Sequence, residues 1–263
     1  MNNILCPSDL SATSETGVAY AELVAKRLGG TITLLHAMNR HEKRTDGGEL
    51  VREELEAQGH SVTQVRVDAQ VREGEFMHII EEASRNGHVL MVCATHGIRG
   101  LRQSLFGPDI IKLVRKVGIP SLVVQKQSPR RNDLGTLVMP VAGHERITAL
   151  LDAVCLLAGK FGSTVHIYQQ LRPGEQPSEA LERNRQLMVQ RLSEAGIPHV
   201  VVQEPSNGFS VGFSQPTIAY AQKVGAGCIA IMAVASEEYR YIADAEKERL
   251  LTNEPGIPVL CAH

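Results

Sequence analysis

The sequence predicts an α/β protein built from two copies of a doubly wound parallel sheet. Apolar segments of strand length alternate with longer amphipathic segments along the whole chain. That alternation is typical of parallel sheets covered by helices. Trp is absent and aromatic residues make up 4% of the chain, so Val, Ile, Leu and Ala must form the core. Such a composition suits strands that are buried on both faces.

A sequence repeat shows that the pattern is written twice. Ile4–Pro7 (ILCP) aligns with Leu137–Pro140 (LVMP) at an offset of 133 residues. Near the ends of the two copies, Gly118–Leu122 (GIPSL) aligns with Gly256–Leu260 (GIPVL) at an offset of 138. Self-similarity at this spacing indicates one fold repeated in tandem.

A polar segment that contains proline, Gln127–Asp133, lies between the two copies and reads as a linker. Domain boundaries usually fall in such exposed polar segments. We therefore expect a first domain over residues 1–128, a linker over 129–134 and a second domain over 135–263.

In the first copy, the apolar segments predict five strands with helices between them. The expected strands are Asn3–Pro7, Thr31–Ala37, Ser61–Val67, His88–Cys93 and Pro120–Val124. The expected helices are one through Ala19–Leu28, ended by Gly29-Gly30, then Glu49–Gln58, Glu73–Arg85, and one ahead of Gly118.

The second copy repeats this order. Its expected strands are Thr136–Val141, Thr164–Gln169, His199–Gln203, Cys228–Val234 and Ile257–Cys261. Its expected helices are Ile147–Phe161, Ser178–Ala195, Gln215–Val224 and a charged helix near Ile242–Leu251.

Composition argues against several classes of partner. The formal net charge is −2, so no general attraction to nucleic acid or membrane is expected. The apolar runs are shorter than the ~20 residues that span a bilayer, and the first residues lack the features of a secretory signal. Five cysteines lie in apolar segments without a CxxC pair, which predicts buried free thiols and a cytoplasmic location.

A ligand site is expected where the order of the parallel strands reverses. If the first and fourth strands are neighbours, their ends bring Pro7–Asp9 close to Ala94–Gly97. A carboxylate at the first tip can bind a ribose hydroxyl. The glycine-bearing loop after the fourth strand leads into a helix and can bind an anion through its amides. Asp9 can equally act as a helix cap with Ser11, and the chemistry alone does not choose between these roles.

In these residues the first copy resembles the universal stress protein family, in its tandem two-domain form. The resemblance rests on ILCPSD near the start, LLHA at the end of the second strand, THG after the fourth strand and GIPSLVV at the end. It implies two flavodoxin-like domains of the HUP, or adenine-nucleotide α-hydrolase-like, class. Each would have a five-stranded, mostly parallel sheet with helices on both faces.

The family's nucleotide signature is Gly, two residues, Gly, nine residues, then Gly followed by Ser or Thr. Here the spacing is kept as Ala94-Thr-His-Gly97, nine residues, then Gly107-Pro108. The resemblance implies that the first domain contacts an adenine nucleotide such as ATP or AMP. Toward the adenosine it implies Pro7, Ser8, Asp9 and Ala37. For the ribose and phosphate loop it implies Ala94, Thr95, His96, Gly97, Gly107, Pro108 and Asp109.

Two departures from the signature predict weak binding. Ala94 adds a Cβ where glycine permits close approach and a positive φ. Pro108 has neither a hydroxyl nor an N–H to offer a phosphate. A hydrogen bond to a charged group is worth roughly 1.5–3 kcal/mol, so losing one or two would weaken binding roughly ten- to a thousandfold or more. Nearby Arg99 and Arg102 offset part of that loss.

The second copy departs further from the signature. Ala142 stands where the first copy has Asp9, and the loop Ala233–Glu238 lacks the glycines. The helix that follows begins among Asp244, Glu246 and Glu248, whose carboxylates would repel a phosphate. We expect this copy to bind no ATP in the family's way and to serve as the pseudo-twofold partner of the first copy, or to bind a different ligand. Two such chains could pair further as a homodimer.

Motifs for catalysis and metal binding are weak. Gly208–Gly212 matches the G-x-S-x-G pattern of a nucleophile elbow, but Glu204–Asn207 separates it from the preceding strand, so we interpret it as a loop. HExxH, Walker A and zinc-ligand spacings are absent. We expect no metal and no catalytic residues, and His96 reads as a packing or hydrogen-bonding residue.

The sequence therefore predicts a regulatory, ligand-binding protein of the stress response, without enzymatic turnover. Weak or variant adenine-nucleotide binding is expected in domain 1 only. One alternative is a structural or protein-interaction module that binds no nucleotide. Another is a slow ATP hydrolase, in which Asp9, Thr95 or His96 would handle water and metal.

Overall fold

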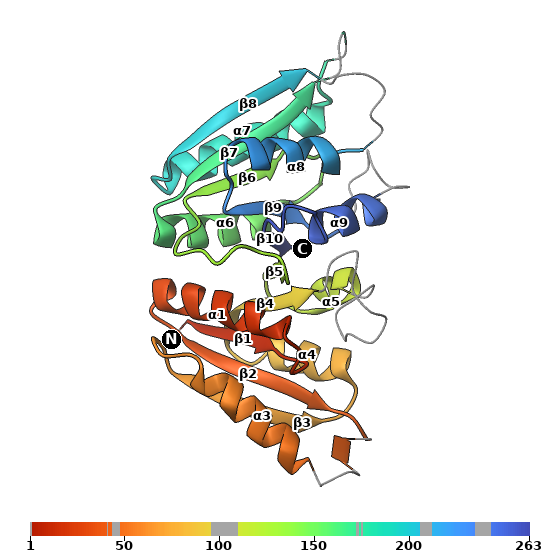
Figure 1. Cartoon of the computed structure of the whole chain (residues 1–263). Helices are drawn as coiled ribbons and strands as arrows, with labels where there is room; N and C mark the ends of the chain where they lie inside the picture. The colour runs from red at the N-terminus through yellow and green to blue at the C-terminus, as the bar shows by residue number, and fades with distance from the viewer. Residues whose placement is uncertain are drawn as a thin grey trace. The chain divides into compact units, whose positions relative to one another are not determined.

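The computed structural model describes residues 2–40, 42–43, 48–95, 110–171, 174, 176–205, 212–234 and 243–263. The chain divides into two compact units, Met1–Asn132 and Asp133–His263. Each unit is an α/β domain with its own sheet and its own covering helices (Figure 1). The division falls inside the segment 129–134 that the sequence suggests as a linker.

Unit 1 contains a five-stranded sheet in the order β3-β2-β1-β4-β5, and its neighbouring strands pair in parallel. The strands are β1 (Asn3–Pro7), β2 (Thr31–Met38), β3 (Val67–Glu73), β4 (His88–Thr95) and β5 (Ser121–Gln125). The helices are α1 (Ser14–Leu28), α3 (Glu49–His60), α4 (Phe76–Ser84) and α5 (Ile110–Lys116). Right-handed crossovers in this strand order set α1 and α3 on one face and α4 and α5 on the other.

Unit 2 repeats the topology in the order β8-β7-β6-β9-β10, again with parallel pairing. The strands are β6 (Thr136–Pro140), β7 (Thr164–Leu171), β8 (His199–Pro205), β9 (Cys228–Met232) and β10 (Val259–Ala262). The helices are α6 (Thr148–Phe161), α7 (Glu179–Glu194), α8 (Ser214–Lys223) and α9 (Ala243–Leu251). The predicted fold class, two flavodoxin-like α/β domains, is confirmed.

The third strand of unit 1 lies later in the chain than the sequence predicts. The alternation in Ser61–Val67 predicted a strand there, but β3 runs over Val67–Glu73. The helix that follows is correspondingly shorter than the predicted Glu73–Arg85, since α4 covers Phe76–Ser84. Both predictions were wrong for the same reason, because β3 takes the residues that the pattern assigned to a loop and a first helical turn.

A side chain from α1 explains this shift. The backbone N–H groups of Thr63 and Gln64 both donate to Oε1 of Glu22, at 2.8 Å each. The carboxylate of Glu22 thus accepts two backbone N–H groups of the predicted strand. These groups are then not available for hydrogen bonds to a neighbouring strand of the sheet. β3 is the edge strand, and Asp68 and Ala69 are exposed, so it lacks the apolar signature of a buried strand.

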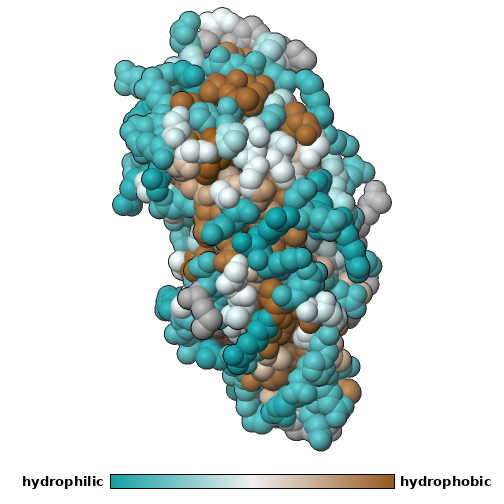
Figure 2. All heavy atoms as spheres, turned by 90° about the vertical axis from the view of Figure 1, so that its left-hand side faces the viewer, coloured by the Kyte–Doolittle hydropathy of each residue, from teal (hydrophilic) through white to brown (hydrophobic). Residues whose placement is uncertain are grey.

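The core and the surface follow the sequence pattern. The strands β1, β4, β5, β9 and β10 are almost entirely buried, and the face seen in Figure 2 is covered mainly by hydrophilic residues. All five cysteines are free thiols, as predicted; four are buried and Cys155 is half-buried. Burial raises the pKa of the Cys6 thiol to about 12, so this thiol stays protonated and unreactive at neutral pH.

Candidate functional site

The candidate site of unit 1 lies at the point where the strand order reverses. β1 pairs with β2 on one side and with β4 on the other, so the chain winds outward in both directions from the boundary between β1 and β4. Ligands of open α/β sheets bind beyond the carboxyl ends of the strands at such a point. The ends concerned are Pro7–Asp9, which begins at the last residue of β1, and Ala94-Thr95, which closes β4.

Ser8 fixes the tip of β1 to two helices. Its backbone N–H donates to Leu35 O at 2.9 Å. Its hydroxyl lies 3.0 Å from Ser14 Oγ of α1 and donates to Gln58 Oε1 of α3 at 2.6 Å. Gln58 Nε2 in turn donates to Ser14 Oγ at 3.0 Å. The buried Ser8 side chain therefore positions the tip and does not face solvent.

Asp9 organises the turn between β1 and α1. Its Oδ1 accepts the backbone N–H of Ser11 at 3.1 Å and the hydroxyl of Ser11 at 2.6 Å. The residue between them, Leu10, has φ of 60° and is the non-glycine residue with positive φ in the described part of the chain. A left-handed conformation costs a non-glycine residue roughly 1–3 kcal/mol and is typical of functional turns. Asp9 is partly exposed, and no described group donates to its Oδ2.

These contacts bear on the two roles that the sequence leaves open for Asp9. The carboxylate does not cap α1 directly, because the N-cap position of that helix is Thr13, without a side-chain cap. Asp9 instead holds an Asx-type turn one step before the helix. One carboxylate oxygen is used for this turn, and the other is available to a ligand.

Beside this tip, His36 supplies a contact that sequence reasoning missed. Its Nδ1 donates to the Ser8 carbonyl at 2.9 Å, and its Nε2 lies 3.5 Å from Glu42 Oε2. His36 is buried in β2, one residue before the predicted adenine contact Ala37, which is also buried. The clue in the sequence is its place at the end of a strand, next to the tip of β1.

Ala94 lies in the extended backbone of β4, paired with Val124. Its Cβ packs on Gly17 of α1, where a Cβ added to that glycine would approach it to 3.3 Å. The methyl group that distinguishes Ala94 from the family's glycine is thus accommodated by a glycine in the facing helix. Thr95, the next residue, is fully buried, and its carbonyl accepts the N–H of Lys126 at 3.2 Å.

The remaining predicted contacts lie outside the described residues. They are His96, Gly97, Gly107, Pro108 and Asp109, together with Arg99 and Arg102. Of the predicted site, the described structure brings together the tips of β1, β2 and β4, which carry Pro7, Ser8, Asp9, Ala37, Ala94 and Thr95.

Comparisons with known proteins identify the family of unit 1. Residues 1–125 match the model of the Universal stress protein family. Unit 1 belongs to the universal stress protein family. No curated protein matches the chain in sequence.

Solved structures extend the likeness to both units. A universal stress protein from Archaeoglobus fulgidus superposes with a TM-score of 0.66 at 18% identity, over 99% of this chain and 96% of that one. A putative universal stress protein from Pseudomonas aeruginosa gives a TM-score of 0.60 at 19% identity, over 99% and 92%. The cytoplasmic domain of a prokaryotic cation chloride cotransporter gives 0.52 at 12% identity, over 99% and 94%. At these identities the likeness concerns the fold, and the same tandem fold occurs in a transporter domain.

The corresponding tip in unit 2 differs from that of the universal stress protein domain in unit 1. β1 pairs Pro7 with Leu35, and β6 pairs Pro140 with Tyr168, at the constant offset of 133 residues. Ala142 therefore replaces Asp9, as the sequence indicates, Gln169 replaces His36 and Gln170 replaces Ala37. The carboxylate and the imidazole of unit 1 are both absent here.

Glu246 has a structural role in unit 2. It is buried in α9, and its Oε2 accepts the N–H and the hydroxyl of Ser214 at 2.8 Å each. Its Oε1 accepts from Arg249 at 2.6 Å. The first turn of α8 is thus capped by an internal carboxylate. From the sequence we expected Glu246 to repel a phosphate. In the structure its Oε2 already accepts the backbone N–H of Ser214.

Among the described residues, no helix has the length and apolar character needed to cross a membrane. In the same part of the chain, no group of three or more His, Cys, Asp or Glu side chains is arranged to hold a metal ion.

Proposed function

We propose that the chain is a regulatory ligand-binding protein in which unit 1 binds an adenine nucleotide weakly and unit 2 does not. The supporting observation is the Asp9 carboxylate at the switch point, with Oδ1 held by Ser11 and no described donor on Oδ2. A ribose diol presents hydroxyl donors, which suit a carboxylate oxygen. Family membership of unit 1 supports the same assignment.

The rigidity of the tip favours a binding role. Ser8, Ser14 and Gln58 form one hydrogen-bonded group, and His36 holds the Ser8 carbonyl. A site whose backbone is fixed before the ligand arrives loses less conformational entropy on binding. Pro108 still lacks the hydroxyl and N–H that the family motif offers to a phosphate, so we expect the affinity for ATP to be low.

We also propose that the chain is not an enzyme. Asp9, the strongest candidate for handling water, is engaged by Ser11 in shaping its own turn. A slow ATP hydrolase that uses Asp9, Thr95 or His96 is the competing view. Phosphate release that depends on Asp9 would favour the hydrolase, and release that is unchanged in Asp9→Ala would count against it.

Titration calorimetry of the full chain with ATP, ADP, AMP, cAMP and adenosine tests the proposal. We expect weak binding of at least one adenine compound, and a roughly tenfold or greater loss in Asp9→Ala, since a hydrogen bond to a charged group is worth roughly 1.5–3 kcal/mol. Asp68→Ala, in the exposed edge strand of the same unit, is the matched control and should leave the affinity unchanged.

The absence of heat with all five compounds at millimolar concentration would contradict nucleotide binding. That result would favour a structural or protein-interaction module, a second candidate supported by the complete burial of Ser8 and Thr95. The two functions are therefore separated by one titration.

A further inference from the structure

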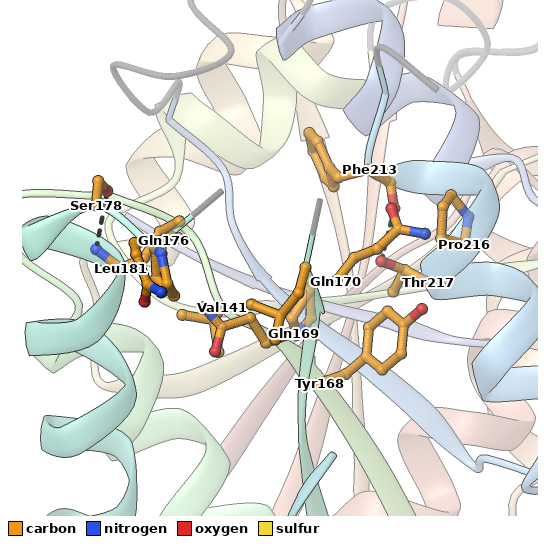
Figure 3. Close-up of a pocket in the computed structure, with 13 residues that line it drawn as sticks. Val141, Tyr168, Gln169, Gln170, Gln176, Ser178, Leu181, Phe213, Pro216 and Thr217 are labelled. Atoms are coloured by element: carbon orange, nitrogen blue, oxygen red, sulfur yellow. Dashed lines mark hydrogen bonds between the residues drawn. The ribbon is translucent and has the colours of Figure 1, made fainter. Parts of the chain in front are cut away.

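Unit 2 contains a cavity beyond the carboxyl ends of β6 and β7. Its volume is about 400 Å³, within the range of roughly 300–1,000 Å³ that is usual for small-molecule sites. Figure 3 shows the end of β7 between the start of α7, with Ser178 and Leu181, and the start of α8, with Phe213 and Thr217. All of these residues belong to unit 2.

The described lining of this cavity carries no charged side chain. Part of its lining is apolar and comes from side chains that include Val141, Leu171, Leu181, Phe213 and Pro216. Its polar side-chain groups are the amides of three glutamines, the phenol of Tyr168, which donates to Glu204 Oε2 at 3.4 Å, and the hydroxyls of Ser178 and Thr217. Both hydroxyls serve their own helices: Ser178 Oγ accepts from Leu181 N, and Thr217 Oγ1 donates to Phe213 O. The amides are therefore the polar groups left for recognition.

The amide of Gln169 has an unused donor. This side chain is 2% exposed, and its Oε1 accepts from Gln203 Nε2 at 3.1 Å. Its Nε2 is buried and has no hydrogen-bond partner. Buried N–H groups are almost always satisfied in folded proteins, and one that is not calls for an explanation. Because Gln169 lines the cavity, a turn of its amide toward the cavity would bring this N–H to a ligand oxygen, which would supply the missing acceptor.

An anion is disfavoured at this position. The N–H of Ser214, at the first turn of α8, already donates to the buried carboxylate of Glu246. That carboxylate is itself paired with Arg249, and it leaves no free donor on Ser214 for an external anion. The replacement of His36 by Gln169 between the two units points the same way, since it removes an imidazole that could carry a positive charge.

One wall of the cavity is held rigid. The ring of Tyr168 stacks on that of Tyr220, with centroids 4.5 Å apart and planes at 14°. Tyr220 is in turn hydrogen-bonded to His166 Nδ1 at 2.7 Å. The neighbouring Val141 N–H donates to Tyr168 O at 2.8 Å. A wall fixed in this way is already organised to receive a ligand.

We propose that unit 2 binds a neutral small molecule, with a flat apolar body and a carbonyl-type oxygen that accepts the N–H of Gln169. The apolar walls hold the body, and Gln169 sets its orientation. This site is distinct from the nucleotide site proposed for unit 1, and it does not depend on that site.

Saturation-transfer NMR on the full chain tests the proposal with matched probes. Benzamide and nicotinamide are flat, neutral and carry an amide oxygen, whereas benzoate and nicotinate have the same shape with a negative charge. We expect saturation transfer to both amides and at least about fivefold weaker binding of both carboxylates. In Gln169→Leu the affinity for the amides should fall about fivefold or more, and in Gln190→Leu, the same change on an exposed part of α7, it should not change.

A second variant guards against misfolding of the first. Leu181→Trp fills the cavity from the opposite wall and should abolish binding while the amide spectrum of unit 2 away from the cavity stays the same. The proposal is overturned if neither amide binds, if the carboxylates bind equally well, or if binding survives both Gln169→Leu and Leu181→Trp. Loss of binding in Asp9→Ala but not in these two variants would locate the probes in unit 1, and would also overturn it.

Discussion

The two units share one backbone plan and differ in how the first strand of each sheet ends. In unit 1 the tip of β1 is held by side chains: the Ser8 hydroxyl reaches Ser14 and Gln58. In unit 2 the loop after β6 is held through its own carbonyls, because Asn184 of α7 donates to Ala142 O at 2.7 Å and to His144 O at 2.8 Å. The end of the first strand is thus fixed in both units. Unit 1 carries the carboxylate of Asp9 there, whereas unit 2 carries the methyl group of Ala142.

A second difference lies where the first helix crosses the fourth strand of each unit. In unit 1 Gly17 lets α1 approach Ala94 closely. The corresponding residues in unit 2 are Leu150 and Met232, which line a small cavity of about 30 Å³. Small residues bring the helix onto the strand in one unit, and large residues fill the space in the other. Strand order and register therefore survive changes in side-chain volume, while the surroundings of the site do not.

The largest expected effect is the loss of stability when Glu246 is replaced. Replacing it with Ala leaves the N–H and hydroxyl of Ser214 without their acceptor in a buried place. We expect the free energy of unfolding of unit 2 to fall by roughly 2–4 kcal/mol. Glu248→Ala, an exposed carboxylate of the same helix, is the control and should change it by less than about 0.5 kcal/mol.

Urea unfolding of the full chain, followed by hydrogen exchange in each unit, measures this difference. Equal losses for Glu246→Ala and Glu248→Ala would show that the internal cap of α8 contributes nothing. A loss confined to unit 1 would contradict the assignment of this contact to unit 2.

An intermediate effect is expected from glycine-to-alanine changes in the corresponding first helices. In Gly17→Ala the new Cβ would lie 3.3 Å from Ala94 Cβ and 3.4 Å from Ala94 N. We expect unit 1 to lose about 1 kcal/mol through overpacking, although alanine is the better helix former. In α6 of unit 2, Gly159→Ala meets no atom within 4 Å, and it should stabilise by roughly 0.5–1 kcal/mol.

A double-mutant cycle makes this comparison sharper. Ala94→Gly in the Gly17→Ala background removes the methyl group that Gly17 accommodates, so it should restore most of the lost stability. If Gly17→Ala is as stabilising as Gly159→Ala, the close approach of α1 to β4 is wrong. If the two changes add without coupling, the two residues do not share one contact.

The smallest expected effect is the change in the stability of each unit as the pH is lowered. Burial lowers the pKa of His166 in unit 2, and burial followed by the charge of Arg72 lowers the pKa of His88 in unit 1, against a backbone hydrogen bond that raises it. Since the unfolded chain then binds more protons than the folded one, stability rises with pH in this window and is lost as the pH falls below the ordinary histidine value of about 6.5.

Unfolding of wild type, His166→Gln and His88→Gln between pH 7.5 and pH 5 tests this dependence. Each substitution should reduce the loss of stability in its own unit and leave the other unit as it was. Identical pH profiles for the wild type and both variants would show that neither imidazole titrates differently on folding.

The sequence predicted the arrangement well where apolar runs are buried and poorly where they are exposed. β1 and β2, central in their sheet, were predicted almost to the residue, because burial on both faces imposes a continuous apolar run. β3 was misplaced because it lies at the sheet edge, and because Glu22, some forty residues away in sequence, holds the segment in front of it. No local pattern contains that contact.

The site was predictable to the same degree. The tips at Asp9 and Ala94 follow from strand order, since the rule for parallel sheets needs only the topology. The packing of Ala94 on Gly17 and the hydrogen bond from His36 to Ser8 could not be predicted from the sequence, because each joins segments that are distant along the chain. The cavity of unit 2 was suggested only as a modified pocket. The Nε2 group of Gln169 has no hydrogen-bond partner among the described residues around this cavity. A sequence alone does not show whether a buried donor has an acceptor nearby.

The offsets between the units carry one more consequence. β3 and β8 correspond at an offset of 132 residues, whereas α4 and α8, which follow them, correspond at 138. The connection between Pro205 and the start of α8 is therefore six residues longer than its counterpart in unit 1, and it ends at Phe213, which lines the cavity. Surface connections change length at little thermodynamic cost. After duplication, the second copy could thus diverge in what it accommodates by altering one connection, with every strand of the inherited sheet left in place.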